Sequence, residues 1–318
     1  MGALPGNAHS ASSGVSFLVI SDDEAGQRID NFLLARLKGV PKSRIYRLLR
    51  KGEVRVNKGR IKPEYRLVSG DTVRVPPVRQ QEAPVVPVPG AALRNLLGAS
   101  ILMETADLLV VDKPAGLAVH GGSGISLGLI EALRASRPDP FLELVHRLDR
   151  GTSGCLLVAR KRSALRDLQR QLREGEVEKI YLCLVKGSWP KGLDRIDAPL
   201  RKITQASGDH IVRPDVAGKQ ALTRFRIVRR FAAHTLLEVG LETGRTHQIR
   251  VHCQLAGHPL AGDDKYGSDD DNARAKAAGL KRMFLHAHRL CFRELDGNVV
   301  TVESPLPDEL ADFLATLP

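Results

Sequence analysis

A proline-rich run divides the 318-residue chain into two parts of unequal length. Five prolines fall between Pro76 and Gly98, and proline both fixes φ and removes the backbone donor that a helix or a central strand requires. We therefore predict an extended, semi-stiff linker over residues 80–98. The chain is long enough for two domains that each bury a core, and we place these at residues 16–79 and 99–318.

Positive charge is concentrated in the first of these domains. Between Gly26 and Arg79 there are 15 Lys and Arg residues against 4 Asp and Glu residues, while the rest of the chain holds 33 against 32. Nearly all of the net charge of +12 therefore lies in one short segment. A compact basic segment beside a nearly neutral body is typical of a protein that grips nucleic acid.

Hydrophobic periodicity predicts two helices and short strands in this basic segment. One helix is expected over Gln27–Leu37, and a second, capped by Ser43, runs to Lys51. Strands are expected at Val54–Val56 and Val73–Val75. Cations on and just after the second helix should bind RNA phosphates without reading the base sequence. These RNA-binding candidates are Lys42, Arg44, Arg47, Arg50, Lys51 and Arg55.

Other features limit the class of protein. Hydrophobic residues make up 42% of the chain and charged residues 26%, as in a soluble globular protein, and no run approaches the roughly 20 apolar residues of a membrane span. Residues 1–15 are small and polar without the features of a signal peptide, so we expect a flexible tail. Four scattered cysteines fit neither a disulfide framework nor a zinc site, which favours a cytoplasmic location.

The segment Val145–Gly154 combines basic residues, one carboxylate, two hydroxyls and two glycines. The apolar run Cys155–Ala159 that follows it predicts a buried strand. Asp149 is thus expected on a tight turn that core structure holds rigid, as nucleophilic or acid–base chemistry by a carboxylate requires. Spacing alone equally allows Asp149 to cap a turn beside solvated arginines.

A second polar segment, Thr243–His252, is expected to lead into a helix. Thr246 can cap that helix, which would run through Leu255. His247 and Arg250 would then share one side of it. The histidines of this region fit no zinc-site spacing, so we predict no metal.

The remainder of the second domain mixes strands, helices and loops. Strands are expected at Asp107–Val111, Lys179–Gly187, Ala221–Val228 and His234–Leu241, and helices at Ser163–Arg173 and Asp308–Thr316. Residues 190–220 should be loop-rich and are candidates for target contacts. The Gly121–Gly124 loop fits either a loop that admits RNA or an ordinary flexible turn, and it lacks the Lys-Ser/Thr of a P-loop.

The stretch His146–Gly154 (His-Arg-Leu-Asp-x-x-Thr-Ser-Gly) resembles the catalytic signature of the pseudouridine synthases that modify ribosomal and transfer RNA, in the branch named for its A-type member. The resemblance implies that Asp149 is the essential aspartate. Gly244–His252 resembles the second signature of the family and implies that Arg250 pairs with Asp149. Tyr181 stands where the family keeps an active-site tyrosine, which implies that it packs on the flipped base.

The same resemblance implies a set of substrate-binding residues. Leu285 is implied as an apolar wall of the base pocket, and Arg147 as the side chain that occupies the site of the flipped base or holds it open. For Arg245, a phosphate contact and a structural contact both remain open. The full implied set is His146, Arg147, Arg245, His247 and Leu285.

The first domain resembles a small S-four-like RNA-binding domain named for a ribosomal small-subunit protein. The resemblance rests on Arg28–Leu33, Lys42–Arg47 and Gly52–Asn57. The implied fold is therefore α+β: a basic αα-β RNA-binding domain, then a synthase core with a mainly antiparallel mixed sheet and a central cleft.

The implied reaction is isomerisation of uridine to pseudouridine. It breaks the N1–C1′ bond of a flipped-out uridine and rejoins the base through C5, with Asp149 as the nucleophile and no cofactor. Attack of Asp149 on C1′, attack on the base and assistance of elimination at the sugar all remain open from the sequence. A hydrolytic glycosidase would need a second carboxylate at a set separation. Within the family the likeness is greatest to enzymes that act on large-subunit ribosomal RNA, so we expect this RNA as the partner. We expect the protein to be a monomer that requires neither a membrane nor another protein.

Two other functions remain open from the sequence. A non-catalytic RNA chaperone or assembly factor with this fold would be recognised by loss of Asp149 or Arg250, and both are present. An enzyme of free uridine derivatives would not need the basic first domain. Strong salt dependence of binding would favour polymeric RNA as the substrate.

Overall fold

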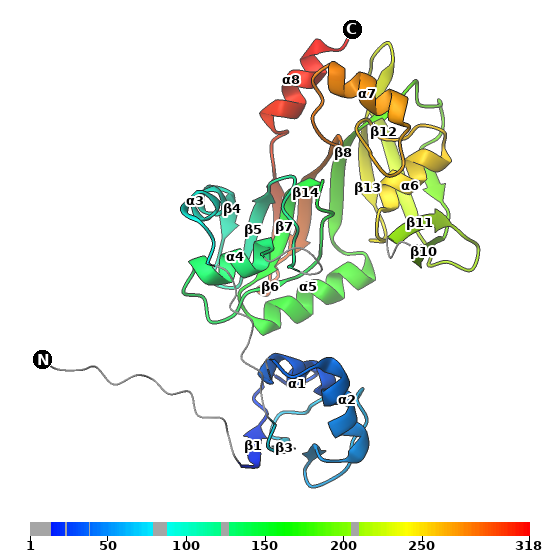
Figure 1. Cartoon of the computed structure of the whole chain (residues 1–318). Coiled ribbons are helices and arrows are strands. Elements are labelled where there is room, and N and C mark those ends of the chain that lie inside the picture. The colour runs from blue at the N-terminus through cyan, green and yellow to red at the C-terminus, as the bar shows by residue number, and fades with distance from the viewer. Residues whose placement is uncertain (1–13, 23, 38, 79–87, 122–126, 205–209) are drawn as a thin grey trace, which may run out of the picture. The chain divides into compact units, whose positions relative to one another are not determined.

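The computed structural model describes residues 14–22, 24–37, 39–78, 88–121, 127–204 and 210–318 (Figure 1). The chain divides into two compact units, Met1–Val86 and Pro87–Pro318, each with its own hydrophobic core. The division falls inside the proline-rich run. The predicted tail up to residue 13, linker residues 80–87 and most of the Gly121–Gly124 loop lie outside the described residues.

The first unit combines two helices with a three-stranded antiparallel sheet. The helices are α1 (Ile29–Arg36) and α2 (Lys42–Lys51), and the strands β1 (Ser16–Val19), β2 (Arg55–Val56) and β3 (Thr72–Val75) lie in the order β1-β3-β2. The apolar faces predicted for both helices form the core. Ile29, Phe32, Leu33, Ile45, Leu48 and Leu49 are all buried.

Helix α2 begins differently from its prediction. Ser43 does not cap it, because Pro41 holds the N-cap position and Lys42 is already helical. Proline suits the start of a helix because its fixed φ is compatible with the first turn, where its missing N–H leaves no bond unmade. The helix ends at Lys51 as predicted, since Gly52 takes a φ of 69°, which glycine adopts without strain.

The prediction of an extended linker is wrong for residues 91–98. Helix α3 (Ala91–Ala99) occupies them, and it belongs to the core of the second unit because Leu97 is buried there. The last proline of the run is Pro89, so nothing in the sequence after Gly90 opposes a helix.

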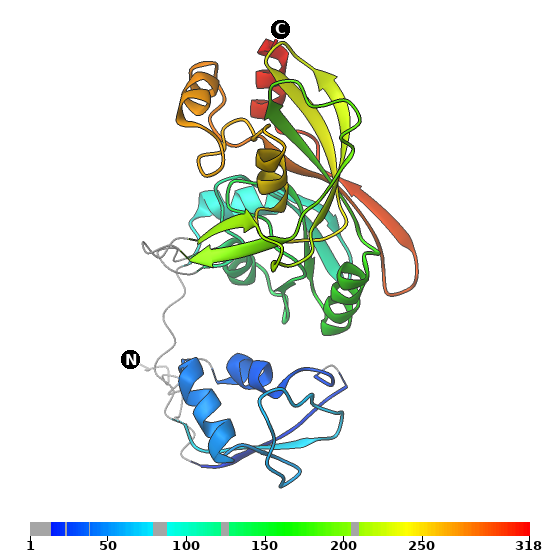
Figure 2. The ribbon, with the colours of Figure 1, turned by 90° about the vertical axis from the view of Figure 1, so that its right-hand side faces the viewer.

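A ten-stranded mixed sheet forms the centre of the second unit (Figures 1 and 2). Its main path is β4-β5-β7-β14-β8-β13-β12-β9, with β15 beside β14 and β6 beside β7. The strands are β4 (Ile101–Glu104), β5 (Leu108–Lys113), β6 (Glu143–Leu144), β7 (Ser153–Ala159), β8 (Glu178–Lys186), β9 (Arg195–Asp197), β12 (Leu222–Arg230), β13 (His234–Leu241), β14 (Leu285–Arg293) and β15 (Val299–Glu303). The pairing of β7 with β14 is parallel and the other pairings in the sheet are antiparallel. The predicted mainly antiparallel mixed sheet is confirmed.

Helices cover the two faces of this sheet because the strands alternate their side chains. Helix α5 (Arg162–Glu174) packs on the face that Leu108 and Leu157 present. Helices α3, α4 (Leu129–Ser136) and α6 (Gln248–Leu255) pack with the face that Leu109 and Leu156 present. Two further helices, α7 (Asp269–Ala277) and α8 (Asp308–Thr316), lie later in the chain.

Strand β7 is an interior strand between β5 and β14, and all seven of its residues are buried. At its start Gly154 has a φ of 107°, and a Cβ there would come within 2.2 Å of the Ala287 carbonyl oxygen of β14. Only glycine allows the two backbones to approach this closely. The last two residues of the motif around Asp149, Ser153 and Gly154, are thereby fixed against β14.

Residues 190–220 contain more regular structure than predicted. Besides β9 they hold an antiparallel hairpin of β10 (Leu200–Thr204) and β11 (His210–Pro214). Its apolar side is anchored, because Leu200 and Val212 pack with Val251 of α6 and with Tyr266. The apolar residues of this region are scattered among Pro, Gly, Asp, Lys and Arg residues without a clear strand or helix period, which is why the sequence indicated loops.

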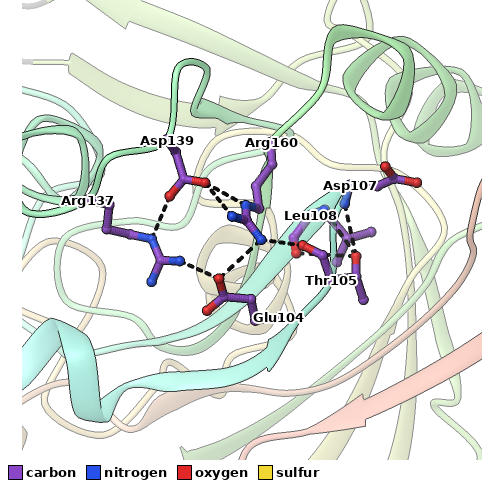
Figure 3. A network of polar contacts seen from close by, with 7 residues as sticks. All are labelled: Glu104, Thr105, Asp107, Leu108, Arg137, Asp139 and Arg160. Atoms are coloured by element: carbon purple, nitrogen blue, oxygen red, sulfur yellow. Dashed lines mark hydrogen bonds and ion pairs between the residues drawn. The ribbon is translucent and has the colours of Figure 1, made fainter.

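A polar network ties the β4–β5 turn to the segment after α4 and to the end of β7 (Figure 3). Asp139 accepts hydrogen bonds from Arg137 Nε at 2.8 Å and Arg160 Nε at 2.7 Å, and both arginines also contact Glu104. Arg160 additionally donates to the Thr105 carbonyl. The network braces the segment that leads through β6 to Asp149.

Candidate active site

Asp149 lies on the loop between β6 and β7, on the tight turn that the sequence predicts. The Thr152 N–H donates to the Asp149 carbonyl at 3.1 Å, and Thr152 itself is buried. The Asp149 carboxylate is 20% exposed and lines a cavity of about 690 Å³. This volume lies within the usual range for a small-molecule site.

Two side chains from the start of α6 face the Asp149 carboxylate. Arg250 Nη1 lies 3.6 Å and His247 Nε2 lies 3.8 Å from Asp149 Oδ2. Both side chains are largely buried, at 12% and 16% exposure. The ion pair that the family resemblance implied for Arg250 is therefore present, although it is not the shortest contact of that arginine.

Asp263 is the main partner of Arg250, and sequence reasoning gave it no role. Arg250 donates through Nε and Nη2 to the two Asp263 carboxylate oxygens, each at 2.7 Å. Asp263 is fully buried and also accepts from the Lys265 and Tyr266 N–H groups. Burial opposes the charged form of Arg250, but the Asp263 carboxylate outweighs it and raises the Arg250 pKa. Arg250 is thus a fixed cation beside Asp149.

The apolar part of the cavity comes from β8 and β14. Tyr181 and Leu285 both line it and are 7% and 4% exposed. Burial, followed by the nearby charge of Asp149, raises the pKa of Tyr181, so its hydroxyl stays protonated. Lys179, also on β8, lines the cavity as well, and burial lowers its pKa. Among the basic residues that line the cavity, Lys179 is one that sequence reasoning did not single out.

The remaining predicted substrate contacts also line the cavity. Arg147 is exposed and so is free to reach a ligand. Arg245 donates to the Gln220 carbonyl at 2.9 Å, which gives it the structural contact left open earlier. His146 Nε2 accepts from the Leu157 N–H of β7 at 3.1 Å, and burial lowers its pKa to about 4, so His146 is neutral and fastened to the sheet.

Helix α6 does not begin as predicted. Thr246 does not cap it, because His247 is the N-cap residue, with a φ of 55° and no side-chain cap. This left-handed conformation is uncommon for a residue with a Cβ and often marks a functional constraint. The helix does run to Leu255 as predicted. His247 and Arg250 reach the same carboxylate because the chain turns sharply at His247.

Lys113, at the end of β5, holds the loop that carries Asp149 in place. It is fully buried, and its ammonium donates to the carbonyls of Pro114, Leu117 and Arg150 at 2.8, 2.8 and 3.2 Å. Burial lowers its pKa to about 7, and the Asp149 charge works in the opposite direction. Lys113 therefore clamps the residue directly after Asp149 to the end of β5.

The six predicted RNA-binding cations belong to the first unit. Lys42, Arg44, Arg47, Arg50, Lys51 and Arg55 are all exposed. Five of them lie on α2, whose opposite side carries the buried residues Ile45, Leu48 and Leu49. The sequence-predicted division of α2 into an apolar face and a basic face is thus present in the structure.

Within the described part of the chain, no group of three or more His, Cys, Asp or Glu side chains could hold a metal ion. Nor does any helix formed by those described residues have the length and apolar content needed to cross a membrane.

Comparison with known proteins agrees with the geometry. Residues 107–255 match the family model described as RNA pseudouridylate synthase, and residues 27–73 match that of the S4 domain. The chain is 56% identical to ribosomal large subunit pseudouridine synthase C of Pasteurella multocida, over 95% of this chain and 94% of that protein. The chain belongs to the RNA pseudouridylate synthase family. The synthase of the same name from Yersinia pestis is 55% identical over 95% of this chain and 96% of its own.

Solved structures of the RNA pseudouridylate synthase family share the fold. Human RNA pseudouridylate synthase domain containing 4 superposes with a TM-score of 0.58 at 24% identity, over 70% of this chain and 95% of that one. The predicted combination of an S4-like domain with a synthase core is confirmed by these comparisons and by the two units of the structure.

Proposed function

We propose that this chain isomerises specific uridines of large-subunit ribosomal RNA to pseudouridine, with Asp149 as the nucleophile. Membership of the family supports the reaction class, and the names of relatives more than half identical over nearly the whole chain support the substrate. The observation that carries the assignment of Asp149 is its position. Its carboxylate faces the cavity between an arginine fixed by a second carboxylate and a wall of apolar side chains.

The cavity suits isomerisation better than hydrolysis. Among the described residues that line it, Glu242 is the other carboxylate besides Asp149. Glu242 accepts from Arg224 Nε at 2.6 Å on an exposed surface, so it is already paired. A hydrolytic glycosidase would use a second carboxylate to activate water, whereas isomerisation returns the same base to the same sugar.

We assign the apolar wall to the flipped base. Tyr181 offers an aromatic face and Leu285 an aliphatic one, and together they replace the stacking that a uridine loses when it leaves the RNA helix. Exposed Arg147 is the candidate for the space that the base vacates. Arg250 pairs with the Asp149 carboxylate and aims it at the bound nucleotide. Together with Asp149, Tyr181 and Arg250 form the proposed catalytic set.

The first unit is assigned to RNA positioning. Its exposed basic face on α2 contacts phosphates, which fixes an RNA without specifying its bases. Such binding weakens steeply with salt because counterions are released. The choice of uridine then depends on the shape of the RNA around the cavity.

The test measures release of tritium from C5 of uridine in unmodified large-subunit ribosomal RNA. Forming the new C5–C1′ bond expels the C5 hydrogen, so release reports the reaction directly. Wild type is expected to release tritium, and Asp149→Asn and Asp149→Ala are expected to bind the RNA without release. Glu242→Gln is the matched control, because it neutralises the other carboxylate of the cavity and should leave release intact. RNA binding without release by wild type would refute the assigned substrate.

A further inference from the structure

Asp149 and four other residues form a closed ring of contacts. Arg250 joins Asp149 to Asp263, whose carboxylate accepts the Tyr266 N–H at 3.1 Å. The Tyr266 hydroxyl lies 2.7 Å from His247 Nδ1, and His247 Nε2 lies 3.8 Å from Asp149 Oδ2. The Arg250 half supplies a charge to the carboxylate. On the other side of the ring, Tyr266 contacts His247, and the interaction of His247 with Asp149 depends on which ring nitrogen carries the proton.

The contacts of the Tyr266 hydroxyl indicate which nitrogen of His247 carries the proton. The Val212 N–H of β11 donates to the hydroxyl oxygen at 3.0 Å. Burial, the largest influence, raises the pKa of Tyr266, so the hydroxyl keeps its proton. Among the residues that the structure describes, His247 Nδ1 is the acceptor within reach of that proton. A hydroxyl that accepts from Val212 and donates to Nδ1 requires Nδ1 to be unprotonated.

The rings are held so that this arrangement persists. Tyr266 is 3% exposed, and its ring meets His247 edge-on, with centroids 5.5 Å apart and an interplanar angle of 74°. The Arg250 guanidinium lies 4.9 Å from the Tyr266 ring centroid, where a cation is attracted to an aromatic face. His247 cannot turn its ring over without breaking the bond to Tyr266.

We propose that Tyr266 is a positioning residue that locks His247 in the tautomer with Nε2–H directed at Asp149. His247 then presents a neutral N–H to the carboxylate across 3.8 Å, while Arg250 supplies the charge. This role rests on the proposed function of Asp149 as the nucleophile. A second full positive charge beside Asp149 would weaken its nucleophilicity, whereas a neutral N–H directs the carboxylate at a smaller cost in reactivity.

The electrostatic setting of His247 agrees with a neutral ring. Burial is the largest influence and lowers its pKa, Asp149 raises it, and Arg250 and Lys265 lower it further. The neutral ring has one N–H, and the tyrosine determines which nitrogen bears it. Without Tyr266 the proton would be free to move to Nδ1, and a lone pair would then face the Asp149 carboxylate.

The first experiment observes the tautomer directly. Ring ¹⁵N shifts of His247 are measured in the full chain with labelled histidine, and the His247→Gln spectrum identifies the signal. Wild type should show Nε2–H at neutral pH. Tyr266→Phe keeps the aromatic ring and removes only the hydroxyl, so it should produce the Nδ1–H form and lower kcat about tenfold, the size of one lost hydrogen bond, with KM unchanged. Tyr46→Phe, whose hydroxyl bonds Asp30 in the first unit, is the matched control and should change neither quantity.

A second experiment gives the answer even if Tyr266→Phe does not fold. The amide nitrogen of Gln can take the place of Nε2, whereas that of Asn takes the place of Nδ1. His247→Gln should therefore keep about tenfold more kcat than His247→Asn, by the same hydrogen-bond reasoning.

The outcomes separate the two proposals. A wild-type His247 that carries its proton on Nδ1, or on both nitrogens at neutral pH, overturns the lock whatever the activity. Where wild type releases tritium, equal kcat for His247→Gln and His247→Asn also overturns it. Absence of tritium release from every variant, with the Nε2–H tautomer present, would instead refute the proposed substrate and leave the lock in place.

Discussion

Arg250 holds two carboxylates at once. Its Nε and Nη2 are occupied by Asp263, so that Nη1 is left for Asp149. Because the two carboxylates contact different nitrogens of the same guanidinium, this position requires an arginine. A planar guanidinium can bind one carboxylate with two nitrogens and still present a third to its neighbour, which a single ammonium cannot do.

Arg250→Lys should therefore lower kcat about 100-fold, comparable to losing one fixed donor at a reacting charge. Tritium release at saturating RNA measures kcat, and circular dichroism checks that the variant is folded. Arg226→Lys is the matched control, because Arg226 also makes a two-nitrogen pair, with Glu238, but on an exposed surface. Near-normal kcat in Arg250→Lys would show that the geometry of the guanidinium is not needed.

The sequence predicted the residues of the site that stand in its two linear signatures. The implied pairing of Arg250 with Asp149 is present, and His247, Tyr181 and Leu285 line the same cavity. Asp263 and Tyr266 received no role, and Lys113 was assigned only to a structural turn beneath the site, because their importance lies in contacts across the fold. A buried aspartate that pairs an arginine thirteen residues earlier has no distinguishing local pattern.

At the scale of elements, periodicity located most helices and strands. Strand β13 and helix α8 have the predicted bounds, His234–Leu241 and Asp308–Thr316. Helix α3 and the β10–β11 hairpin were missed for a common reason. Each places few side chains in the core, such as Leu97 and Val212, and its order depends on docking there. Propensity within a short segment does not reveal such docking.

The network around Asp139 should make the stability of the second unit depend on pH. Burial tends to raise the Asp139 pKa, but hydrogen bonds from Arg137 and Arg160 outweigh it and lower the pKa below its ordinary value. A lowered carboxyl pKa stabilises the fold above the unfolded pKa of about 3.9 and ceases to do so as pH falls through the folded value. Asp139→Asn should lower the free energy of unfolding by about 2 kcal/mol at pH 7.

Urea denaturation of both proteins from pH 7 down to pH 3 measures this effect. The difference in free energy of unfolding between wild type and Asp139→Asn should shrink below about pH 4. There the Asp139 carboxyl of the unfolded wild-type chain takes up a proton more readily than that of the folded protein. Asp296→Asn provides the comparison, because Asp296 is an exposed turn residue of the same unit. A constant difference across this range would mean that the ion pairs do not supply the stability.

At the scale of the whole molecule, charge and chemistry are divided between two units. The first carries the surplus of positive charge and the second carries the cavity. Because each unit has its own core, changes to the surface of one should leave the other folded. Affinity for RNA and rate of reaction can then be altered separately.

Replacing Arg44 and Arg47 together by Glu should weaken RNA binding and its salt dependence. Loss of two phosphate contacts lowers the slope of log affinity against log salt by roughly 1.5. Filter binding across a salt series measures the slope, and kcat at saturating RNA should stay unchanged. Lys276→Glu with Lys281→Glu makes the same charge change on exposed residues of the second unit. An equal fall in slope for both pairs would argue against a specific role for α2.

The parallel pairing of β7 with β14 also sets the order in which a nascent chain can mature. Ser153 on β7 bonds His286 on β14, 133 residues later, whereas the first unit completes its sheet by Val75. Contacts so distant in sequence form slowly and late. During synthesis the basic unit can therefore fold early, while the loop that bears Asp149 stays unsupported until β14 has emerged. A growing chain thus completes the unit proposed to bind RNA well before the loop that carries the proposed nucleophile is supported.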